Sequence, residues 1–260
     1  MTPPQLDLEG KVVIVTGGTM GAGKGIALRF LEAGANVTVC ARHAPSSSIA
    51  IAGREAAFVE TNVRKIDDIE RTIADVLSRH GRLDVLVNNA GGSPPADAAT
   101  ASPKFSASII DLNLVAPLNF AQQANAVMQG QTEGGCIINI GSVSGLRPSP
   151  ETAAYGAAKA GLLNLTKSLA IEWAPKVRVN AIAAGMILTE KADMHFGTGE
   201  TRKAVERVKP MGRMASPSDV GNVCLFLASP LASYVTGASL ELHGGGEVPG
   251  FLLAAKGETP

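Results

Sequence analysis

The sequence predicts an α/β fold: a doubly wound, seven-stranded parallel sheet with helices on both faces, in three layers. Short apolar runs rich in β-branched residues alternate with segments of helical spacing along the 260 residues. The first run, residues 11–15, leads directly into a glycine-rich stretch at residues 16–23, and a helical pattern follows. Because no repeat, linker or low-complexity segment divides the chain, we expect one domain over residues 1–260.

The composition is that of an ordinary globular protein, with 45% hydrophobic and 18% charged residues and a formal net charge of zero. A zero net charge provides no electrostatic basis for binding nucleic acid or an anionic membrane surface. No apolar run approaches the ~20 residues of a membrane span, and the first residues do not resemble a signal peptide. Three scattered cysteines argue against a disulfide framework and a metal cluster. We therefore expect a cytoplasmic protein without a metal site.

Each short apolar, β-branched run is interpreted as a buried strand. The expected strands are residues 11–15, 36–40, 56–60, 83–87, 136–140, 177–182 and 238–242. Helical spacing predicts helices at residues 24–33, 66–80, 105–128, 155–173 and 217–227. Residues 44–54 leave room for a stunted helix at most. Residues 186–209 are irregular and charged, so we expect a substrate loop over about residues 186–212.

The glycine-rich stretch suits a phosphate-binding turn. Gly17 permits a tight turn, whereas Gly21 and Gly23 let the backbone approach a pyrophosphate. The start of the following helix would supply N–H donors and the positive end of its dipole. Between a strand and a helix, this pattern predicts dinucleotide binding, and a plain turn is the alternative.

The end of the second strand bears on the choice of cofactor. An NAD enzyme places an acidic residue there for the ribose 2′-hydroxyl, but this chain has Cys40, Ala41, Arg42 and His43. Arg42 could form a paired contact with a 2′-phosphate, which favours NADP(H) and leaves NAD(H) possible. A solvated arginine at a strand end is the alternative.

Polar residues also follow the later strands, at the sheet edge where ligands bind in parallel sheets. Asn89, Ala90 and Gly91 follow the fourth strand. Ser142 follows the fifth strand and lies 13 positions before Tyr155, so the intervening loop could bring the two hydroxyls together. Asn113 interrupts an apolar helical segment and must find a hydrogen-bond partner. For Ser142 and Asn113 a purely structural role is the alternative.

Tyr155 and Lys159 lie one helical turn apart, so both project from one face. A phenol ordinarily titrates near ~10, and a neighbouring cation favours the phenolate and lowers its pKa. The two side chains are therefore a candidate general acid/base pair. Taken alone, the same spacing is more often an exposed surface pair.

Together these motifs resemble the short-chain dehydrogenase/reductase superfamily in its single-domain, Rossmann-like form. The resemblance extends from about residue 8 to residue 246 and keeps the motifs in order. It implies hydride transfer between a nicotinamide cofactor and a small-molecule carbonyl or secondary alcohol. It also implies a homotetramer, with a dimer as the alternative. Four residues of the last long helix could supply apolar surface for both core and partner: Ala158, Leu162, Leu165 and Leu169.

The resemblance implies catalytic roles for four residues. Tyr155 is the proton donor or base, Ser142 holds the substrate oxygen, and Lys159 lowers the pKa of Tyr155 and binds the nicotinamide ribose. Asn113 bends its helix and holds a water that takes part in proton relay. The expected cofactor contacts are Gly17, Thr19, Gly21, Gly23, Arg42, Asn62, Val63, Asn89, Ala90, Gly91, Tyr155, Lys159, Gly185, Ile187 and Thr189.

Some positions depart from the usual family pattern. Asn62 and His243 stand where Asp is common, Ala184 replaces a frequent Pro, and the stretch after Arg42 is shortened. The pattern assigns no role to His243. Arg147 and His195 lie in the loops that would meet substrate. An anionic substrate and a solvated surface are the alternatives for both.

The expected activity is NADPH-linked reduction of a ketone, such as a 3-oxoacyl thioester. An NAD-dependent secondary-alcohol or steroid dehydrogenase of the same family is the alternative. A non-catalytic nucleotide-sensing protein is disfavoured because Ser142, Tyr155 and Lys159 are all retained. Epimerisation or dehydration is disfavoured because the larger members that catalyse it have a different glycine spacing and an extra C-terminal domain.

Overall fold

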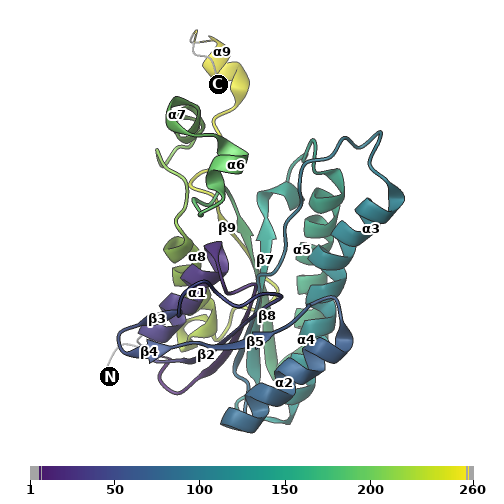
Figure 1. The fold of residues 1–260 in the computed structure, drawn as a ribbon, viewed down its shortest axis with the longest axis vertical. Coiled ribbons are helices and arrows are strands. Elements are labelled where there is room, and N and C mark those ends of the chain that lie inside the picture. The colour runs from purple at the N-terminus through teal and green to yellow at the C-terminus, as the bar shows by residue number, and fades with distance from the viewer. Residues whose placement is uncertain (1–5, 7, 256, 258–260) are drawn as a thin grey trace.

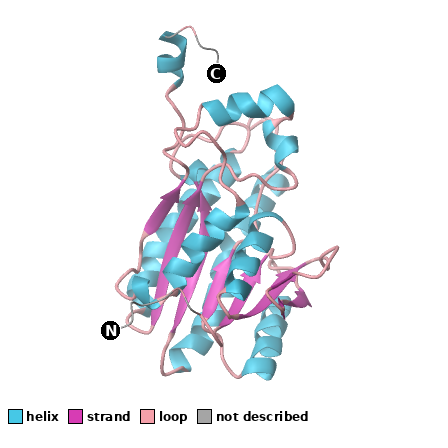
Figure 2. Ribbon diagram, turned by 90° about the vertical axis from the view of Figure 1, so that its left-hand side faces the viewer, coloured by secondary structure: helices cyan, strands magenta, loops and turns pink. Residues whose placement is uncertain are grey.

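The computed structural model describes residue 6, residues 8–255 and residue 257. In that part of the chain, seven parallel strands form one sheet in the order β5-β2-β1-β6-β7-β8-β9 (Figures 1 and 2). This confirms the predicted seven-stranded parallel sheet. The strands are β1 (Val12–Thr16), β2 (Asn36–Ala41), β5 (Ala57–Glu60), β6 (Val85–Asn88), β7 (Gly135–Ser142), β8 (Val177–Ala184) and β9 (Ser239–Leu242).

The order of the strands determines where a ligand site can form. β1 pairs with β2 on one side and with β6 on the other. The chain adds β2 and β5 outward from β1 and then returns to place β6 against its opposite side. At such a reversal the connections leave the sheet in opposite directions, so a crevice opens beyond the carboxyl ends of the two central strands.

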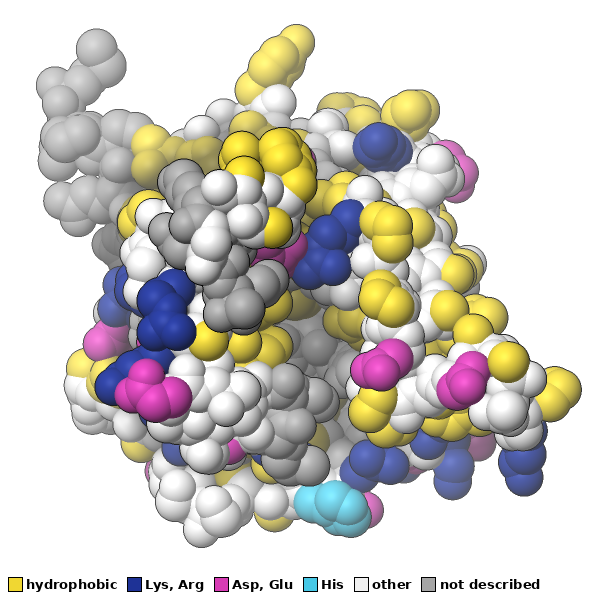
Figure 3. Space-filling model, turned by 90° about the horizontal axis from the view of Figure 1, so that it is seen from above, with side chains coloured by type: hydrophobic (Ala, Val, Ile, Leu, Met, Phe, Trp, Pro, Cys, Tyr) yellow, Lys and Arg dark blue, Asp and Glu magenta, His cyan; other side chains and the backbone are white. Residues whose placement is uncertain are grey.

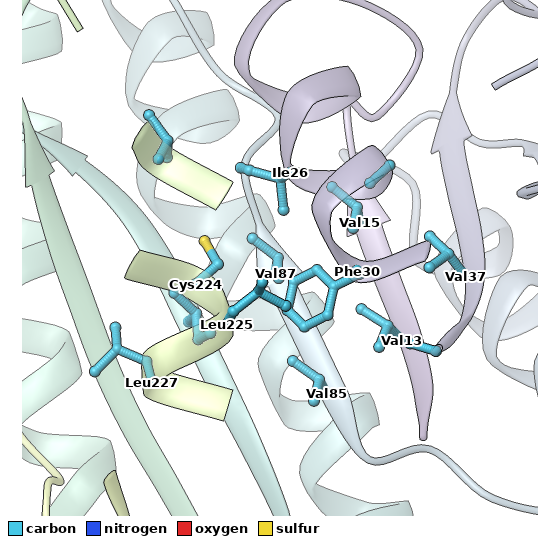
Figure 4. Packing of buried hydrophobic residues seen from close by; sticks show 14 of the residues in the cluster. Val13, Val15, Ile26, Phe30, Val37, Val85, Val87, Cys224, Leu225 and Leu227 are labelled. Carbon is cyan, nitrogen blue, oxygen red and sulfur yellow. The ribbon is translucent and has the colours of Figure 1, made fainter. Parts of the chain in front are cut away.

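Helices cover both faces of the sheet because alternate strand residues point to opposite sides. Val13 and Val15 pack against one helical layer and Val12 and Ile14 against the other. Figure 4 shows Phe30 between the valines of β1, β2 and β6, close to the buried side chains of α8. The first layer holds α1 (Gly21–Glu32) and α8 (Pro217–Ala228); the second holds α2 (Ile66–His80), α4 (Ala116–Gly130) and α5 (Ala153–Trp173).

The helix predicted over residues 105–128 contains a widened turn. It consists of α3 (Pro103–Ile110), a π-helical turn η1 (Asp111–Val115) and α4. Ser102 caps its start by accepting a hydrogen bond from the main-chain N–H of Phe105. In the π turn the N–H of Ala116 bonds to the oxygen of Asp111, five residues earlier. This turn contains Asn113.

Residues 44–54, where the sequence left room for a stunted helix at most, form no helix in the structure. That stretch contains a two-stranded antiparallel hairpin, β3 (Ala50–Ile51) with β4 (Arg54–Glu55). Ala52 and Gly53 both have positive φ, as a tight two-residue hairpin turn requires. Ile49 is buried among the residues that pack around α1. The hairpin therefore depends on long-range contacts, among them the burial of Ile49 and the ion pair of Arg54 with Glu9, and on an unusual turn. Neither produces a recognisable period in the sequence.

The predicted irregular structure over residues 186–209 is wrong in part. Two short helices, α6 (Ala192–Phe196) and α7 (Gly199–Arg207), form there and lie above the sheet (Figure 1). An ion pair of 3.0 Å between Arg202 and Asp193 joins them. No residue of α7 is buried, so this helix lacks the apolar stripe by which helices are recognised. A third short helix, α9 (Gly250–Ala255), follows β9.

The inner face of α5 is already occupied by the core of this chain. Ala158, Leu162 and Leu169 are buried, and Leu165 packs against the cluster beneath the sheet. Ala158, Leu162 and Leu169 are therefore used by the core, whereas Leu165 stays half-buried and its contact with a partner stays a prediction. The described residues contain no helix that is long and apolar enough to cross a membrane. Nor do they bring three or more His, Cys, Asp or Glu side chains together as a metal site would need.

Candidate active site

The glycine-rich turn joins β1 to α1 and is packed too tightly for side chains. Gly17 and Gly21 have φ values of 63° and 53°, a region that favours glycine. A Cβ on Gly23 would collide with the main-chain oxygen of Gly17 and with the side-chain amide of Asn89. α1 begins at Gly21, earlier than predicted, so the last two glycines of the motif form its first turn. The bare backbone can therefore approach a bound group closely.

Hydrogen bonds of Thr16 and Asn89 hold this turn against the end of β6. The Thr16 hydroxyl accepts hydrogen bonds of 2.9 Å from the main-chain N–H groups of Asn89 and Ala90. The Asn89 amide donates to the oxygens of Thr16 at 2.8 Å and Gly17 at 3.3 Å. Sequence reasoning did not assign a site role to Thr16. Its position between a buried strand and the first glycine was the available signal.

A cavity of about 830 Å³ lies beside this turn, at the reversal between β1 and β6. Figure 3, which looks down on this end of the molecule, shows a hollow near the centre with basic and acidic side chains on its rim. Of the predicted cofactor contacts, nine line the cavity: Gly17, Thr19, Gly23, Arg42, Asn62, Val63, Asn89, Ala90 and Gly91. Both the volume and the glycine cradle are compatible with a dinucleotide.

The cavity wall beyond β2 is basic. It includes the exposed Arg42, His43 and, from the turn after β5, Arg64. Among the described residues that line the cavity, Glu190 alone carries a carboxylate, and it lies at the start of α1. Asn62 accepts a hydrogen bond from the N–H of Arg64 at 3.2 Å, so it shapes this turn. This end of the cavity therefore has positive charge and no acidic group.

Ser142 and Tyr155 meet at the carboxyl end of the sheet. Ser142 is the last residue of β7 and pairs in register with Ala184 of β8. A 3₁₀ turn, η2 (Val143–Gly145), then brings the chain onto α5, where a Cβ on Gly145 would lie 2.7 Å from the main-chain nitrogen of Ala160. The Ser142 hydroxyl lies close enough to the Tyr155 phenol to lower the pKa of that phenol. The two hydroxyls therefore lie near each other, as predicted.

Lys159 is a buried cation without a carboxylate partner among the described residues. Only 4% of it is exposed, and its ammonium donates a hydrogen bond of 2.7 Å to the main-chain oxygen of Ile140. Its Nζ lies 5.6 Å from the centre of the Tyr155 ring. Burial lowers the pKa of Lys159 to about 8 because a charged group loses hydration. The exposed surface pair considered above is excluded.

The pKa of Tyr155 shifts in the direction opposite to that expected from its neighbour. Burial raises the pKa of the phenol, and the hydrogen bond with Ser142 lowers it to a smaller extent. Lys159 does not contribute to this shift, so the expectation that it lowers the pKa of Tyr155 is not met in this structure. The phenol is therefore protonated at neutral pH.

Asn113 connects the widened helical turn to the end of β6. Its amide donates hydrogen bonds of 2.9 Å to the main-chain oxygens of Gly92 and Ile109, and its oxygen accepts one from the N–H of Gly92. A Cβ on Gly91 would lie 2.6 Å from that oxygen and 3.4 Å from the Lys159 ammonium. Asn113 lies in a π-helical turn, and the bend expected there stays a prediction. The Asn113 side chain is engaged with protein groups, and holding a water also stays a prediction.

The remaining predicted cofactor contacts follow β8. Gly185 donates its N–H to the oxygen of Leu242, and a Cβ there would lie 2.8 Å from Cβ of His243. Ile187 forms an isolated bridge with Ala215. Thr189 lies at the start of α1, where its Cγ2 would be 3.4 Å from a Cβ on Gly21. The loop after β8 therefore begins against the glycine-rich turn.

The three ionisable residues without assigned roles differ in their surroundings. Arg147 donates to Glu247 at 2.9 Å, and the buried Lys209 donates to the same carboxylate oxygen at 2.7 Å. These ion pairs join the loop after β7, the substrate loop and the segment after β9. His243 contacts Glu241 at 2.6 Å, while its buried Nδ1 lacks a hydrogen-bond partner within the described structure. The side chain of His195 lies outside the described part of the chain.

Comparisons with known proteins agree with this geometry. The family model described as enoyl-(acyl carrier protein) reductase matches residues 17–247. The chain is 37% identical to 3beta-hydroxysteroid dehydrogenase 1 of Eggerthella lenta, with 94% of this chain and 97% of the relative covered. It is also 37% identical to the 3-oxoacyl-[acyl-carrier-protein] reductase of Chlamydia muridarum, with 92% of this chain and 98% of the relative covered.

Among solved structures, the ligand-free aldohexose dehydrogenase of Thermoplasma acidophilum superposes with a TM-score of 0.85. It is 31% identical in sequence, and the match covers 92% of this chain and 94% of that one. The chain therefore belongs to the short-chain dehydrogenase/reductase family, as an oxidoreductase that acts on CH–OH groups with NAD(P) as the acceptor.

Proposed function

We propose that this protein is an NADPH-linked carbonyl reductase in which Tyr155 is the general acid. The observation that carries the proposal is the grouping of Ser142, Tyr155 and the buried Lys159 at the end of the sheet that also holds the cavity. Burial keeps the phenol protonated at neutral pH, which is the state that a proton donor in reduction requires.

Each of the grouped residues has a distinct task in this proposal. The bound nicotinamide supplies the hydride. Tyr155 donates its phenolic proton to the carbonyl oxygen in reduction and takes it back in oxidation. Ser142 donates a hydrogen bond to that oxygen as its negative charge grows. Lys159, whose pKa is about 8, is mostly protonated at neutral pH and can return a proton to the phenolate.

The glycine turn fits the pyrophosphate because it offers main-chain N–H groups and excludes side chains. We assign the adenosine half to Asn62, Val63, Asn89, Ala90 and Gly91. We assign the nicotinamide half to Tyr155, Lys159, Gly185, Ile187 and Thr189.

The preference for NADP(H) rests on Arg42, supported by the basic wall around it. A 2′-phosphate adds negative charge where Arg42, His43 and Arg64 lie, and an arginine can bind it through two parallel hydrogen bonds. A ribose 2′-hydroxyl would find no carboxylate there among the described residues that line the cavity. NAD(H) is the alternative, and it requires other groups to bind the hydroxyls of the adenosine ribose.

For the substrate we propose a 3-oxoacyl thioester or a ketone of similar form. A relative named as a 3-oxoacyl-[acyl-carrier-protein] reductase supports this class. A steroid ketone is the second candidate, because an equally identical relative is named as a 3beta-hydroxysteroid dehydrogenase. The two differ in shape: a thioester enters end-on as a thin chain, whereas a steroid needs a broad apolar surface.

Assembly and location complete the proposal. We propose a cytoplasmic homotetramer, with a dimer as the alternative, built on the outer faces of the long helices. Exposed apolar side chains on those helices support an interface: Ile110, Val115 and Ile171, of which Ile171 is 82% exposed. Sedimentation velocity on the full chain distinguishes tetramer, dimer and monomer.

Absorbance at 340 nm with NADPH and NADH, measured separately, tests the proposed reaction. The ketone panel contains acetoacetyl-CoA, simple and cyclic ketones, and steroid ketones. Oxidation of NADPH with acetoacetyl-CoA is the expected result. A faster steroid reaction would replace the substrate class, and a preference for NADH would replace the cofactor assignment. Cofactor binding without turnover of any ketone would favour a nucleotide-sensing protein.

A further inference from the structure

A carboxylate of the substrate loop forms a hydrogen bond with the glycine-rich turn. Glu190 Oε2 accepts a hydrogen bond of 3.0 Å from the main-chain N–H of Gly21, the first residue of α1. Glu190 also lines the same cavity as Gly17 and Gly23. A negatively charged oxygen from the loop therefore already lies where the proposed pyrophosphate would bind.

The first turn of α1 has no anion of its own. Its N-cap residue, Met20, makes no side-chain hydrogen bond, and the first turn contains no acidic residue. The unpaired N–H groups and the dipole at a helix start favour negative charge. Glu190, 169 positions further along the chain, supplies it. The contact is tertiary and can be released without breaking the helix.

We infer that Glu190 is an internal competitor of the cofactor, whose carboxylate must leave the start of α1 before the pyrophosphate can bind. The inference rests on the proposed dinucleotide role of the turn. Both groups are acceptors for the same N–H and both are negative, so they exclude each other. Only molecules whose Glu190 has moved away can bind, which lowers the apparent affinity by that fraction.

The same contact couples cofactor binding to the position of the substrate loop. The base of the loop is held by hydrogen bonds of Leu188 and Met186 with Ala215, and its far end by the ion pair of Lys209 with Glu247. Glu190 lies between these two attachments. Displacing its carboxylate therefore frees the middle of the loop, with α6 and α7, to adjust around a substrate while both ends stay anchored.

Stopped-flow measurement of NADPH binding, followed by nicotinamide fluorescence, tests the inference. The proteins compared are wild type, Glu190→Gln, Glu190→Ala and the control Glu200→Gln. Glu200 lies on α7 in the same loop and pairs with Lys203, so its substitution removes an equal charge away from the turn. For both Glu190 variants we expect the association rate constant to rise about three- to tenfold, with dissociation changed less than about twofold.

Several results would overturn the inference. An unchanged association rate in both Glu190 variants would show that the carboxylate does not block the turn. A change confined to the dissociation rate constant would show that Glu190 repels the cofactor only in the bound complex. An equal rise of the association rate constant in Glu200→Gln would show a general effect of charge. If calorimetry shows that wild type binds neither NADPH nor NADH, the proposed function fails with it. Amide exchange is the second readout: without cofactor, residues 186–212 should exchange faster in Glu190→Ala than in wild type.

Discussion

Tyr155 and Lys159 are two titratable residues on which burial acts in opposite directions. The ordinary pKa values of a phenol and an ammonium, 10.0 and 10.5, make the phenol the slightly stronger acid. Burial raises the pKa of Tyr155 and lowers that of Lys159 to about 8, because each charged form loses hydration. The order of acid strength is therefore reversed. A proton lost by Tyr155 can be replaced from Lys159 with a favourable free energy.

Replacing Tyr155 by Phe removes the proposed proton donor while keeping the ring. We expect turnover to fall by about 10²- to 10⁴-fold, while the Kd for cofactor changes by less than about threefold because the main binding surface is the glycine turn. Steady-state kinetics and calorimetric titration measure the two quantities. The control is Tyr234→Phe, since Tyr234 is the other tyrosine and is fully exposed. Full activity in Tyr155→Phe would exclude the mechanism.

The buried ammonium of Lys159 makes stability depend on pH. The pKa of Lys159 is about 8 in the folded chain and has its ordinary value of 10.5 in the unfolded chain. Between these values the unfolded state binds more protons, so the free energy of unfolding rises with pH. Lys159→Met lacks this contribution. Between about pH 8 and 10.5, we expect the free energy of unfolding of wild type to rise by roughly 3 kcal/mol more than that of the variant.

Urea unfolding of wild type and Lys159→Met at several pH values measures that difference. The buried cysteines titrate in both proteins, so their contribution cancels in the comparison. A difference that stays constant with pH would show that the Lys159 ammonium is not destabilised by burial.

At the scale of elements, the first turn of α1 illustrates how backbone and ligand requirements coincide. Gly17 and Gly21 adopt positive φ, and Gly23 lies against the oxygen of Gly17. The same close packing exposes the N–H groups that the proposed pyrophosphate and Glu190 would share. A side chain at Gly23 would widen the turn, so that neither the pyrophosphate nor Glu190 could bind its N–H groups as closely.

Gly23→Ala is the corresponding prediction. The added methyl collides with the Gly17 oxygen and the Asn89 amide, so the turn must move. We expect the Kd for cofactor to rise at least about tenfold and the protein to lose about 1–3 kcal/mol of stability. Isothermal titration and urea unfolding measure these. Gly130→Ala in α4 is the matched control, because a Cβ there meets nothing within 4 Å. Equal cofactor affinity in wild type and Gly23→Ala would refute the assignment of the turn.

For the whole molecule, the site exists because the sheet brings distant segments together. The cavity takes residues from the turns after β1, β2, β5 and β6 and from the substrate loop. Ser142 and the start of α5 lie at the same carboxyl edge. The reversal of strand order between β1 and β6 creates the opening.

Arg42→Ala tests the charge arrangement in this assembled cavity. Losing the guanidinium removes a charge-assisted contact that only a 2′-phosphate can use. We expect the Kd for NADPH to rise by about 10- to 100-fold, whereas that for NADH changes by less than about threefold. Calorimetric titration with each cofactor measures the ratio. Arg79→Ala, which loses only its pair with Asp75 on α2, controls for net charge. Equal losses for both cofactors would count against NADP(H) selection by Arg42.

The sequence by itself determined the sheet, the order of its elements and the place of the site. Apolar β-branched runs and glycine turns are local signals, since a strand or a tight turn depends on neighbouring residues. The one-turn spacing likewise placed Tyr155 and Lys159 on one helical face. Motifs at strand ends then predicted one shared edge, because parallel strands all end there.

Only the tertiary structure determined the pKa shifts at that site and the hydrogen bonds that hold its segments together. It buried Lys159 with a hydrogen bond to the Ile140 oxygen and reversed the shift expected for the pKa of Tyr155. It placed the Glu190 carboxylate within hydrogen-bond distance of the Gly21 N–H. It also formed the β3–β4 hairpin and the two helices of the substrate loop. Each of these depends on burial or on partners far apart in the chain. Burial and distant contacts are properties of the packed molecule, and no local period encodes them.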